Sequence, residues 1–213
     1  MKKVYFFGSL ILLMATLGRT PAADSAVSAA RISHITGEVQ ARLGSRWGRA
    51  GVNQTLYAGM TVRTGSQSRS EIRYRDGSVI RMGSRTLLRI REAHDLHLLR
   101  GKTWIKKQHD PSQKLKIRTP IAVASVIGTE LFVSHNEQDI SHVTTLNGVV
   151  EVTGPAGDTR RVNPGEWVEI EPEKPLEVPT KFDWNSLKKR ERFMIDLNFT
   201  PPAELPADNE DWQ

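Results

Sequence analysis

Arginines that recur along strand-like stretches are the residues whose type and spacing best suit a chemical role. The 213-residue chain has 30 Lys and Arg against 24 Asp and Glu. Arginine presents planar donors that pair with phosphate and carboxylate groups in a bidentate way, so a face of arginines could bind an anionic polymer such as lipopolysaccharide, a wall polymer or DNA. The arginines concerned are Arg63, Arg69, Arg73, Arg75, Arg81, Arg85, Arg89, Arg91 and Arg100. The alternative is a solvated sheet face whose charge deters edge pairing and attracts the acidic C-terminal part of the chain.

A second candidate is a group of His and Asp residues between positions 135 and 142. His135, Asp139 and His142 could bind a metal if a hairpin brought them together. The segment SHNEQDISH lies between two strand-like stretches, however, and is more typical of a polar loop. His94 and His97 would point to opposite faces of a strand, which prevents chelation. We therefore predict no metal site.

The sequence holds no familiar catalytic motif. It contains no Cys, which excludes a disulfide framework, a thiolate metal site, a cysteine nucleophile and a lipidated cysteine. No nucleophile elbow, HExxH, P-loop or dinucleotide fingerprint is present. The sequence does not exclude a pair of catalytic carboxylates of the glycosidase type, because acidic residues are frequent after Glu130. We predict no catalytic residue and no cofactor.

The elements that must position these residues are short strands. Fourteen of the 16 Gly lie between Gly37 and Gly165. Short alternating runs are separated there by turn signals about every 8 to 12 residues, which is typical of an all-β domain. The clearest strands are EVQARL, KTWIKK, KLKIRT, TELFVS, HVTTLN, VVEV and EWVEIE. We place this domain at residues 31–171.

One hairpin can be predicted in detail from SEIRYRDGSVIRM, because Asp76-Gly77 is the strongest short turn signal. A two-residue loop would place Ile72 opposite Arg81 and mix the two faces. A three-residue loop at 75–77 places Ile72 opposite Ile80 and keeps one face apolar, so we predict that register. In it, four arginines share a solvent face and are the candidate binding residues: Arg73, Arg81, Arg89 and Arg91.

Residues 1–30 have the pattern of a secretory signal peptide. Lys2 and Lys3 precede an uncharged run at residues 4–18, and small residues accumulate up to Ala30. An uncleaved anchor is the alternative, but fifteen helical residues span about 22 Å, less than the roughly 30 Å hydrocarbon core. We expect cleavage after Ser28 or Ala30, no membrane span afterwards, and a periplasmic or secreted protein without a lipid anchor.

The composition changes after residue 171. A proline-rich linker at 172–182 precedes a predicted helix at 183–197 with Asp183 as its N-cap, and residues 198–213 resemble a disordered acidic tail. Charge follows the same order along the chain: residues 31–118 carry a net charge of +13 and residues 119–213 carry −9. The mature chain is therefore charge-polarised rather than uniformly basic.

The order of these strands and turns resembles the FecR domain of periplasmic regulators and other exported bacterial proteins. The resemblance covers roughly residues 31–171. Its most distinctive piece is IRTPIAVASVIGTELFVS, where Thr119-Pro120 is followed by Gly128-Thr129. The other matching pieces are RISHITGEVQARLGSRWGRAGVNQTLYAGMTVRTG, SEIRYRDGSVIRMGSRTLLRI, LLRGKTWIKK, TLNGVVEV and VNPGEWVEI. Ile127 departs from the Arg that is common before Gly-Thr, a change that affects a structural contact rather than function.

The resemblance implies a two-layer antiparallel β-sandwich, jelly-roll-like, to which this sequence adds a short C-terminal helix. It implies no catalytic residues, because the family has no known chemistry of its own. Sigma-regulating members resemble a cytoplasmic anti-sigma segment, a transmembrane helix and then this domain. Here the domain follows a signal peptide directly, so we do not expect a transmembrane sigma regulator.

We therefore predict an exported, non-catalytic binding or signalling module of the bacterial periplasm or envelope. Its partner would be an envelope protein or an anionic envelope polymer, and export argues against genomic DNA. The alternatives are an envelope polysaccharide-active enzyme and a structural envelope component docked through its helix. The sequence leaves the ligand, the pathway and the oligomeric state open.

Overall fold

The computed structural model describes residues 28–191, and these form seventeen strands and one helix. The strands are β1 (Ser28–Thr36), β2 (Val39–Arg42), β3 (Gly48–Arg49), β4 (Thr55–Tyr57), β5 (Thr61–Thr64), β6 (Arg69–Tyr74), β7 (Val79–Met82), β8 (Leu87–Glu92), β9 (Asp95–Lys106), β10 (Leu115–Arg118), β11 (Val123–Val126), β12 (Glu130–His135), β13 (Ser141–Asn147), β14 (Val150–Thr153), β15 (Thr159–Val162), β16 (Glu166–Ile170) and β17 (Thr180–Lys181). The helix is α1 (Trp184–Arg190). Segments 1–27 and 192–213, with most of the predicted signal peptide and all of the predicted acidic tail, lie outside the described residues.

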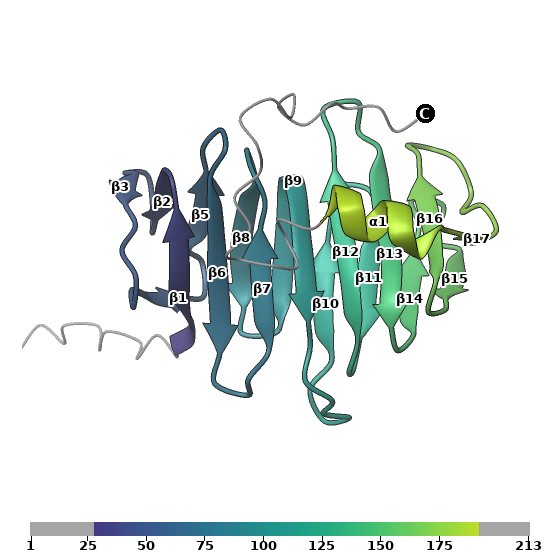
Figure 1. Ribbon diagram of the computed structural model, residues 1–213, viewed down its shortest axis with the longest axis horizontal. Helices are drawn as coiled ribbons and strands as arrows, with labels where there is room; N and C mark the ends of the chain where they lie inside the picture. The colour runs from purple at the N-terminus through teal and green to yellow at the C-terminus, as the bar shows by residue number, and fades with distance from the viewer. Residues whose placement is uncertain (1–27, 192–213) are drawn as a thin grey trace, which may run out of the picture.

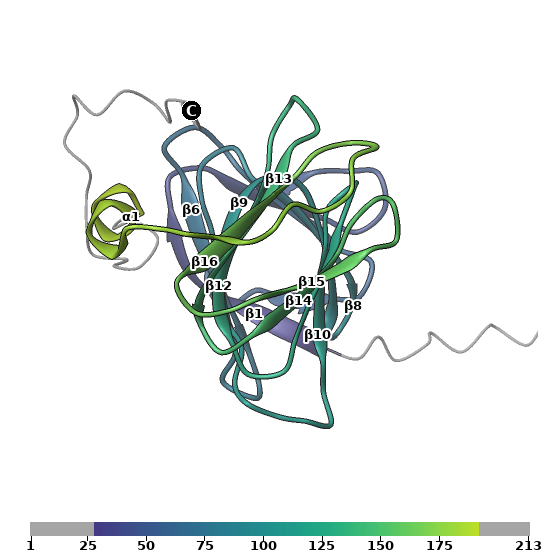
Figure 2. The same ribbon diagram turned by 90° about the vertical axis from the view of Figure 1, so that its right-hand side faces the viewer.

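The strands form two layers that face each other. Sheet A has the order β4-β1-β6-β7-β9-β12-β13-β16-β17. Sheet B has the order β3-β2-β5-β8-β9-β10-β11-β14-β15. Figure 1 shows the strands side by side along the long axis, and Figure 2 shows the two layers end-on. The chain alternates between the layers as it advances from one end of the sandwich to the other.

Strand β9 belongs to both layers. Its first half pairs with β8 and β10 in sheet B, and its second half pairs with β7 and β12 in sheet A. The change occurs near Gly101, whose φ of +91° lies in the left-handed region that glycine adopts most readily. A β-carbon at this position would lie 2.6 Å from the Thr86 Cα, so glycine is also required by close packing.

The core lies between the layers because apolar residues alternate with polar ones along most strands. Leu88 and Ile90 of β8 and Leu131 and Val133 of β12 are among the buried residues that fill it. Each such strand turns one face inward, which follows from the two-residue period of β-structure. Tight packing of these two inner faces is the main stabilising contribution to the fold.

The predicted hairpin register is confirmed. Ile72 pairs with Ile80 and Glu71 pairs with Arg81. The loop between β6 and β7 has Gly77 at a φ of +84°, and the Tyr74 N–H donates to the Ser78 carbonyl oxygen at 2.9 Å. The side-chain pattern therefore selected the loop length, as expected.

The all-β prediction and the short C-terminal helix are confirmed. One detail of the pairing is corrected: β9 and β10 run parallel, whereas the other strand pairs are antiparallel. The parallel pair arises because the chain leaves β9 in sheet A and returns to sheet B before β10 begins. Within residues 28–191, no helix is long and apolar enough to cross a membrane.

The segment after β16 is tied to the sandwich. Leu176 is buried in the core, its N–H donates to Asp158 Oδ2 at 2.7 Å, and β17 pairs with β16. Helix α1 then begins after Asp183, whose carboxylate accepts from the N–H groups of Asn185 and Ser186. The predicted N-cap is thus confirmed, and the predicted extension of the helix to residue 197 lies outside the described residues.

Candidate binding faces of the sandwich

Glu71 organises two of the predicted arginines on the outer face of sheet A. Arg73 Nη2 lies 2.7 Å from Glu71 Oε1, and Arg81 Nε lies 3.0 Å from Glu71 Oε2. The Ser33 hydroxyl donates a third hydrogen bond to Glu71 Oε1 at 2.7 Å. The Glu71 side chain is only 3% exposed. These contacts place one carboxylate at the centre of a compact charged group.

The contacts of Glu71 determine its ionisation. Burial raises the pKa of Glu71, but the hydrogen bonds from Ser33, Arg73 and Arg81 outweigh it and hold that pKa below its ordinary value of 4.5. Arg81 also lies over the Trp104 ring, 4.5 Å from its centroid. Arg81 is therefore committed to contacts within the protein, whereas the Arg73 side chain remains 56% exposed.

Arg89 and Arg91 lie on the other layer, so the prediction that four arginines share one face is wrong. Both residues are exposed on β8, which belongs to sheet B, while Arg73 and Arg81 lie in sheet A. The physical reason is the connection at residues 83–86, which carries the chain from one layer to the other after β7. Alternation places all four side chains outward, but outward from opposite layers.

The histidines considered for a metal site do not converge. His135 lies on the inner side of sheet A, where its Nδ1 is 3.0 Å from the Ser141 hydroxyl and 3.6 Å separates its Nε2 from Asp139. Burial lowers the pKa of His135. His142 lies on the outer side of the same sheet, with its Nε2 2.7 Å from Glu169 Oε2. Within residues 28–191, no group of three or more His, Asp and Glu side chains could hold a metal ion.

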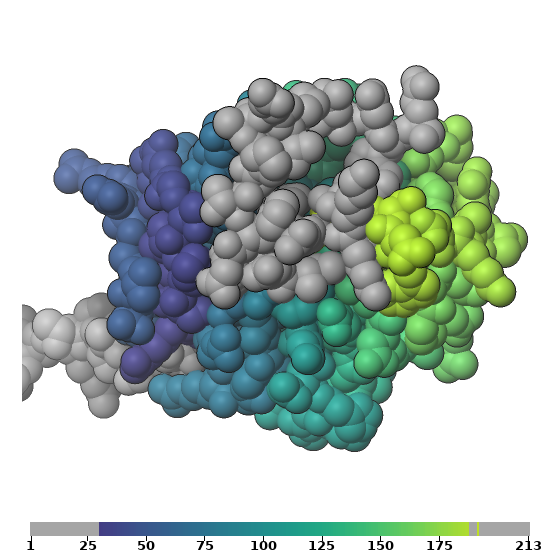
Figure 3. All heavy atoms as spheres, in the orientation of Figure 1, coloured from purple at the N-terminus to yellow at the C-terminus, as the bar shows by residue number. Residues whose placement is uncertain are grey.

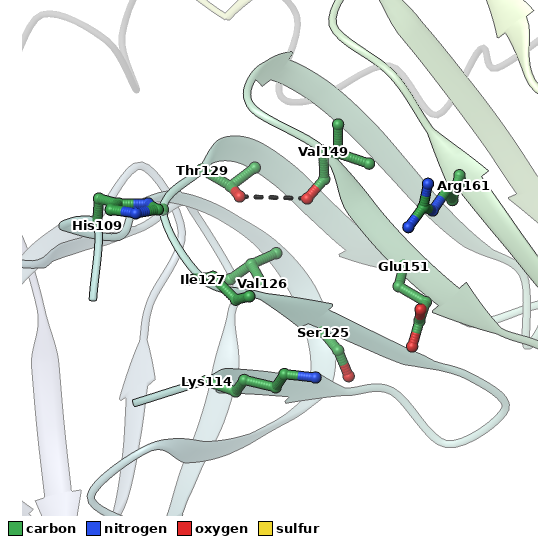
Figure 4. A pocket seen from close by; sticks show the side chains of 10 residues that line it. His109, Lys114, Ser125, Val126, Ile127, Thr129, Val149, Glu151 and Arg161 are labelled. Atoms are coloured by element: carbon green, nitrogen blue, oxygen red, sulfur yellow. Dashed lines mark hydrogen bonds between the residues drawn. The ribbon is translucent and has the colours of Figure 1, made fainter. Parts of the chain in front are cut away.

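A shallow hollow of about 350 Å³ lies on sheet B beside β11 and β14. Figure 4 shows the side chains of Lys114, Glu151 and Arg161 around it, together with Ser125 of β11. Glu151 is the one carboxylate in its described lining. Hydrolysis of a glycosidic bond ordinarily needs a pair of carboxyl groups on either side of the bond, so this hollow lacks the arrangement of a glycosidase.

An apolar group on the outer face of sheet A was missed by the sequence-based prediction. It consists of Val79, Trp104, Phe132 and Leu146, and we call it the outer cluster. It is separate from the core between the layers. The run Leu131-Phe132-Val133 was the available signal, because three apolar residues in a row place side chains on both faces of a strand.

Helix α1 covers the outer cluster. Leu187 packs against it and is 3% exposed, and Phe182 lies at its margin. Just beyond the helix, Lys102 Nζ on β9 lies 2.7 Å from Glu191 Oε1. Figure 3 shows α1 lying against this face of the molecule, and Figure 2 shows it outside the layer formed by β12 and β16. The outer face of sheet A is therefore a surface that accepts a helix.

The comparisons with known proteins agree with this fold. Two crystal structures of a candidate anti-sigma factor from Parabacteroides distasonis, at 1.65 and 2.50 Å resolution, are each 18% identical to the chain with a TM-score of 0.54. The alignments cover 62% and 63% of this chain and 64% and 63% of theirs, which is less than two thirds of their length. At this identity the likeness shows the fold alone.

The family comparison identifies the central part of the chain. No curated protein matches the chain. Residues 60–151 match the family model described as FecR protein. This range runs from β5 into β14 and includes both the Asp76-Gly77 hairpin and the Thr119-Pro120 to Gly128-Thr129 segment. The central strands of the sandwich are therefore similar to the FecR family over residues 60–151.

Proposed function

We propose that the protein is an exported, non-catalytic binding and signalling module of the bacterial envelope. The FecR match supports a regulatory class, and the candidate anti-sigma factor with the same fold supports signalling through protein contacts. The observation that carries the proposal is the outer cluster on sheet A. A sandwich that turns large apolar side chains outward and seats a helix on them has a surface suited to protein contact.

The contact of α1 with sheet A indicates what this surface recognises. A leucine enters the outer cluster, and a carboxylate one turn later pairs with Lys102. A helix with an apolar residue and an acid four positions apart presents both on one side. Docking of an amphipathic helix is a recurring mode of protein recognition, and α1 shows that this face can serve it.

Export is the second part of the proposal. The described sandwich begins with β1 at Ser28. Cleavage after Ser28, one of the two expected sites, would remove only the first residue of β1 and leave the seventeen described strands in place. Arg89 and Arg91, exposed on β8 of sheet B, add a second mode of contact, with an anionic ligand. We take a periplasmic location as the setting for both.

The test is a deletion strain in which the gene is restored in two forms. We expect the deletion to change the transcript levels of a limited set of genes, and the full chain to restore them. A form in which residues 2–27 are removed should accumulate in the cytoplasm and fail to restore them. Unchanged transcripts after deletion would contradict signalling, and full restoration by the leaderless form would contradict action in the envelope.

A further inference from the structure

The outward positions of sheet B carry an excess of positive charge that sheet A does not share. In β2, β5, β8 and β10, basic side chains point outward while their neighbours in sequence face the core. Arg49 of β3 pairs with Gln40 and lies on the same side. We call this surface the cationic face; its basic residues are Arg42, Arg49, Arg63, Arg89, Arg91, His97, Lys116 and Arg118.

The register places several of these residues in one row across five strands. Arg42 pairs with Thr61, Thr61 with Arg89, Arg89 with His97, and His97 with Arg118. Adjacent strands lie about 4.8 Å apart, so the row is about 19 Å long. The positive charges of Arg42, Arg89 and Arg118 therefore lie along one line across the strands, with Thr61 and His97 between them.

Most of these charges have no acidic partner in the described part of the chain. On the cationic face, the ion pair found there joins Arg118 to Asp95 at 2.9 Å. On sheet A, by contrast, Glu71 pairs with two arginines and Glu191 pairs with Lys102. The outer face of sheet B therefore has few acidic partners for its basic side chains, whereas the sheet A cations near Glu71 and Glu191 are paired.

Neutral contacts hold part of the cationic face in place. The guanidinium groups of Arg42 and Arg63 lie over the Trp47 ring, 4.5 and 4.2 Å from its centroid. Arg63 Nε also donates to Gln40 Oε1 at 2.8 Å. These contacts orient the two side chains without neutralising them, which lowers the entropic cost of binding an anion.

Two further observations mark the far end of the row. Burial lowers the pKa of His97, and the nearby charges of Arg91, Arg118 and Arg89 lower it further, as a positive local field requires. A hollow of about 300 Å³ adjoins His97 and Arg118 and extends along residues 119–123. The row of charges thus leads to a depression large enough for a substituent of a bound polymer.

We propose that the cationic face binds an anionic polysaccharide. The inference rests on the proposed function as a binding module and names the chemical class of one of its ligands. A protein partner would ordinarily need an apolar centre with little charge, which this face does not offer. A flat bilayer could contact only part of a twisted sheet, whereas a flexible chain with repeated acidic groups can follow the row.

The test uses the purified mature chain and fluorescein-labelled polygalacturonate, with binding followed by anisotropy from about 20 to about 300 mM NaCl. We expect binding at low salt that weakens as salt screens the exposed charges. Charge reversal in Arg89→Glu/Arg91→Glu should weaken binding by about tenfold or more, because two attractive pairs become repulsive. Unlabelled neutral dextran should not compete.

A matched control is Arg75→Glu/Lys106→Glu, which makes the same change in net charge at exposed positions in the β6–β7 loop and on the sheet A half of β9. We expect less than about a twofold effect on affinity, with both variants keeping the wild-type melting curve. The proposal fails if nothing binds at low salt or if the control loses as much affinity as the double variant. It also fails if polyglutamate, or equimolar phosphatidylglycerol and phosphatidylcholine vesicles, bind more tightly than polygalacturonate. None of these outcomes bears on the transcript test of the proposed function.

Discussion

At the residue scale, Glu71 determines what the arginines of sheet A can do. It is buried, accepts from Ser33 and pairs with both Arg73 and Arg81. Arg81 is in turn held between this carboxylate and the Trp104 ring. A guanidinium that is already paired and stacked must give up those contacts to bind an external anion. Of the four arginines proposed from the sequence, Arg81 is therefore better explained as structural, whereas Arg73 is paired with Glu71 but stays largely exposed.

Replacing Glu71 by Gln should destabilise the protein at neutral pH. We expect the free energy of unfolding to fall by about 2–3 kcal/mol at pH 7, because Arg81 loses its charged partner in a largely buried site. Urea denaturation measures the loss. Arg73→Ala provides the control, and its cost should stay below about 1 kcal/mol since that side chain is largely exposed. Equal losses in the two variants would show that Glu71 is not the centre of the group.

The stability difference between wild type and Glu71→Gln should depend on pH, with a sign that follows from the pKa of Glu71. The pKa of Glu71 is lower in the folded protein than in the unfolded chain, so its stabilising contribution is present above the ordinary value of 4.5. As the pH falls, Glu71 of the unfolded chain takes up a proton first, near its ordinary pKa, and the stabilising contribution begins to decrease. The contribution is lost once the pH has fallen through the lower pKa of the folded protein. Denaturation curves of wild type and Glu71→Gln should therefore converge in acid. A constant difference down to acid pH would contradict this.

At the element scale, the bend in β9 joins the two layers. The Thr86 hydroxyl donates to the Lys102 carbonyl oxygen and accepts from the Lys102 N–H, each at 3.1 Å. These bonds hold β9 against the connection that brings the chain into β8. Gly101 must therefore combine a left-handed backbone with the absence of a side chain.

Gly101→Ala should be far more harmful than a glycine substitution in open space. Its β-carbon would meet the Thr86 backbone, and we expect a loss of about 2–4 kcal/mol in the free energy of unfolding. Gly44 is the matched control, since it has a φ of +77° and no atom within 4 Å of an added β-carbon. Gly44→Ala should cost about 1 kcal/mol from backbone strain alone. Thermal denaturation compares the two, and similar melting temperatures would refute the packing argument.

Helix α1 is the element whose folding depends most on its docking to the rest of the protein. It is seven residues long and depends on Leu187 and the Lys102–Glu191 pair for its position. Isolated helices of this length are not stable in water. The helix should therefore form only while it is docked on the outer cluster.

Leu187→Ala should release α1 without unfolding the sandwich. The substitution removes three buried carbons at about 0.8 kcal/mol each, which weakens docking by about 2 kcal/mol. Limited trypsin digestion should then cut within α1 much faster while residues 28–181 resist. Val178→Ala, at a position that is 79% exposed, should leave the cleavage rate unchanged. If Leu187→Ala leaves it unchanged as well, the helix is not held by the outer cluster.

At the scale of the whole molecule, charge is divided between the two layers as well as along the chain. On sheet A, Arg73, Arg81 and Lys102 are paired with Glu71 and Glu191, whereas the cations of sheet B mostly have no acidic partner among the described residues. The apolar surface that accepts a helix lies on sheet A. The molecule thus offers two chemically different outer faces, one for each of the contacts that we propose.

The position of Ala30 bears on where the predicted signal peptide would be removed. Ala30 is buried and pairs with both Leu56 and Tyr74, whereas β1 begins at Ser28. Cleavage after Ala30 would delete these contacts, so of the two expected sites we predict cleavage after Ser28. Mass spectrometry of the protein from the envelope fraction should find Ala29 as the first residue. A chain that begins at Arg31 would contradict the prediction.

The sequence by itself determined the features that depend on neighbouring residues. Alternation showed that the chain is all-β, the Asp76-Gly77 turn with its apolar face selected the hairpin register, and Asp183 marked the start of the helix. Turn geometry, strand period and capping are local interactions, so a short stretch of sequence contains all the information that they need.

Only the tertiary structure decided which layer each strand joins. An outward arginine has the same sequence pattern in either sheet, so the separation of Arg73 and Arg81 from Arg89 and Arg91 depended on the path of the chain at residues 83–86. The same holds for Phe132, whose apolar side chain lies outside the core, where α1, which begins 52 residues later at Trp184, returns to cover it. The alternation of apolar and polar residues indicates which of the two faces of its strand a side chain lies on. What it faces is decided by packing between distant segments.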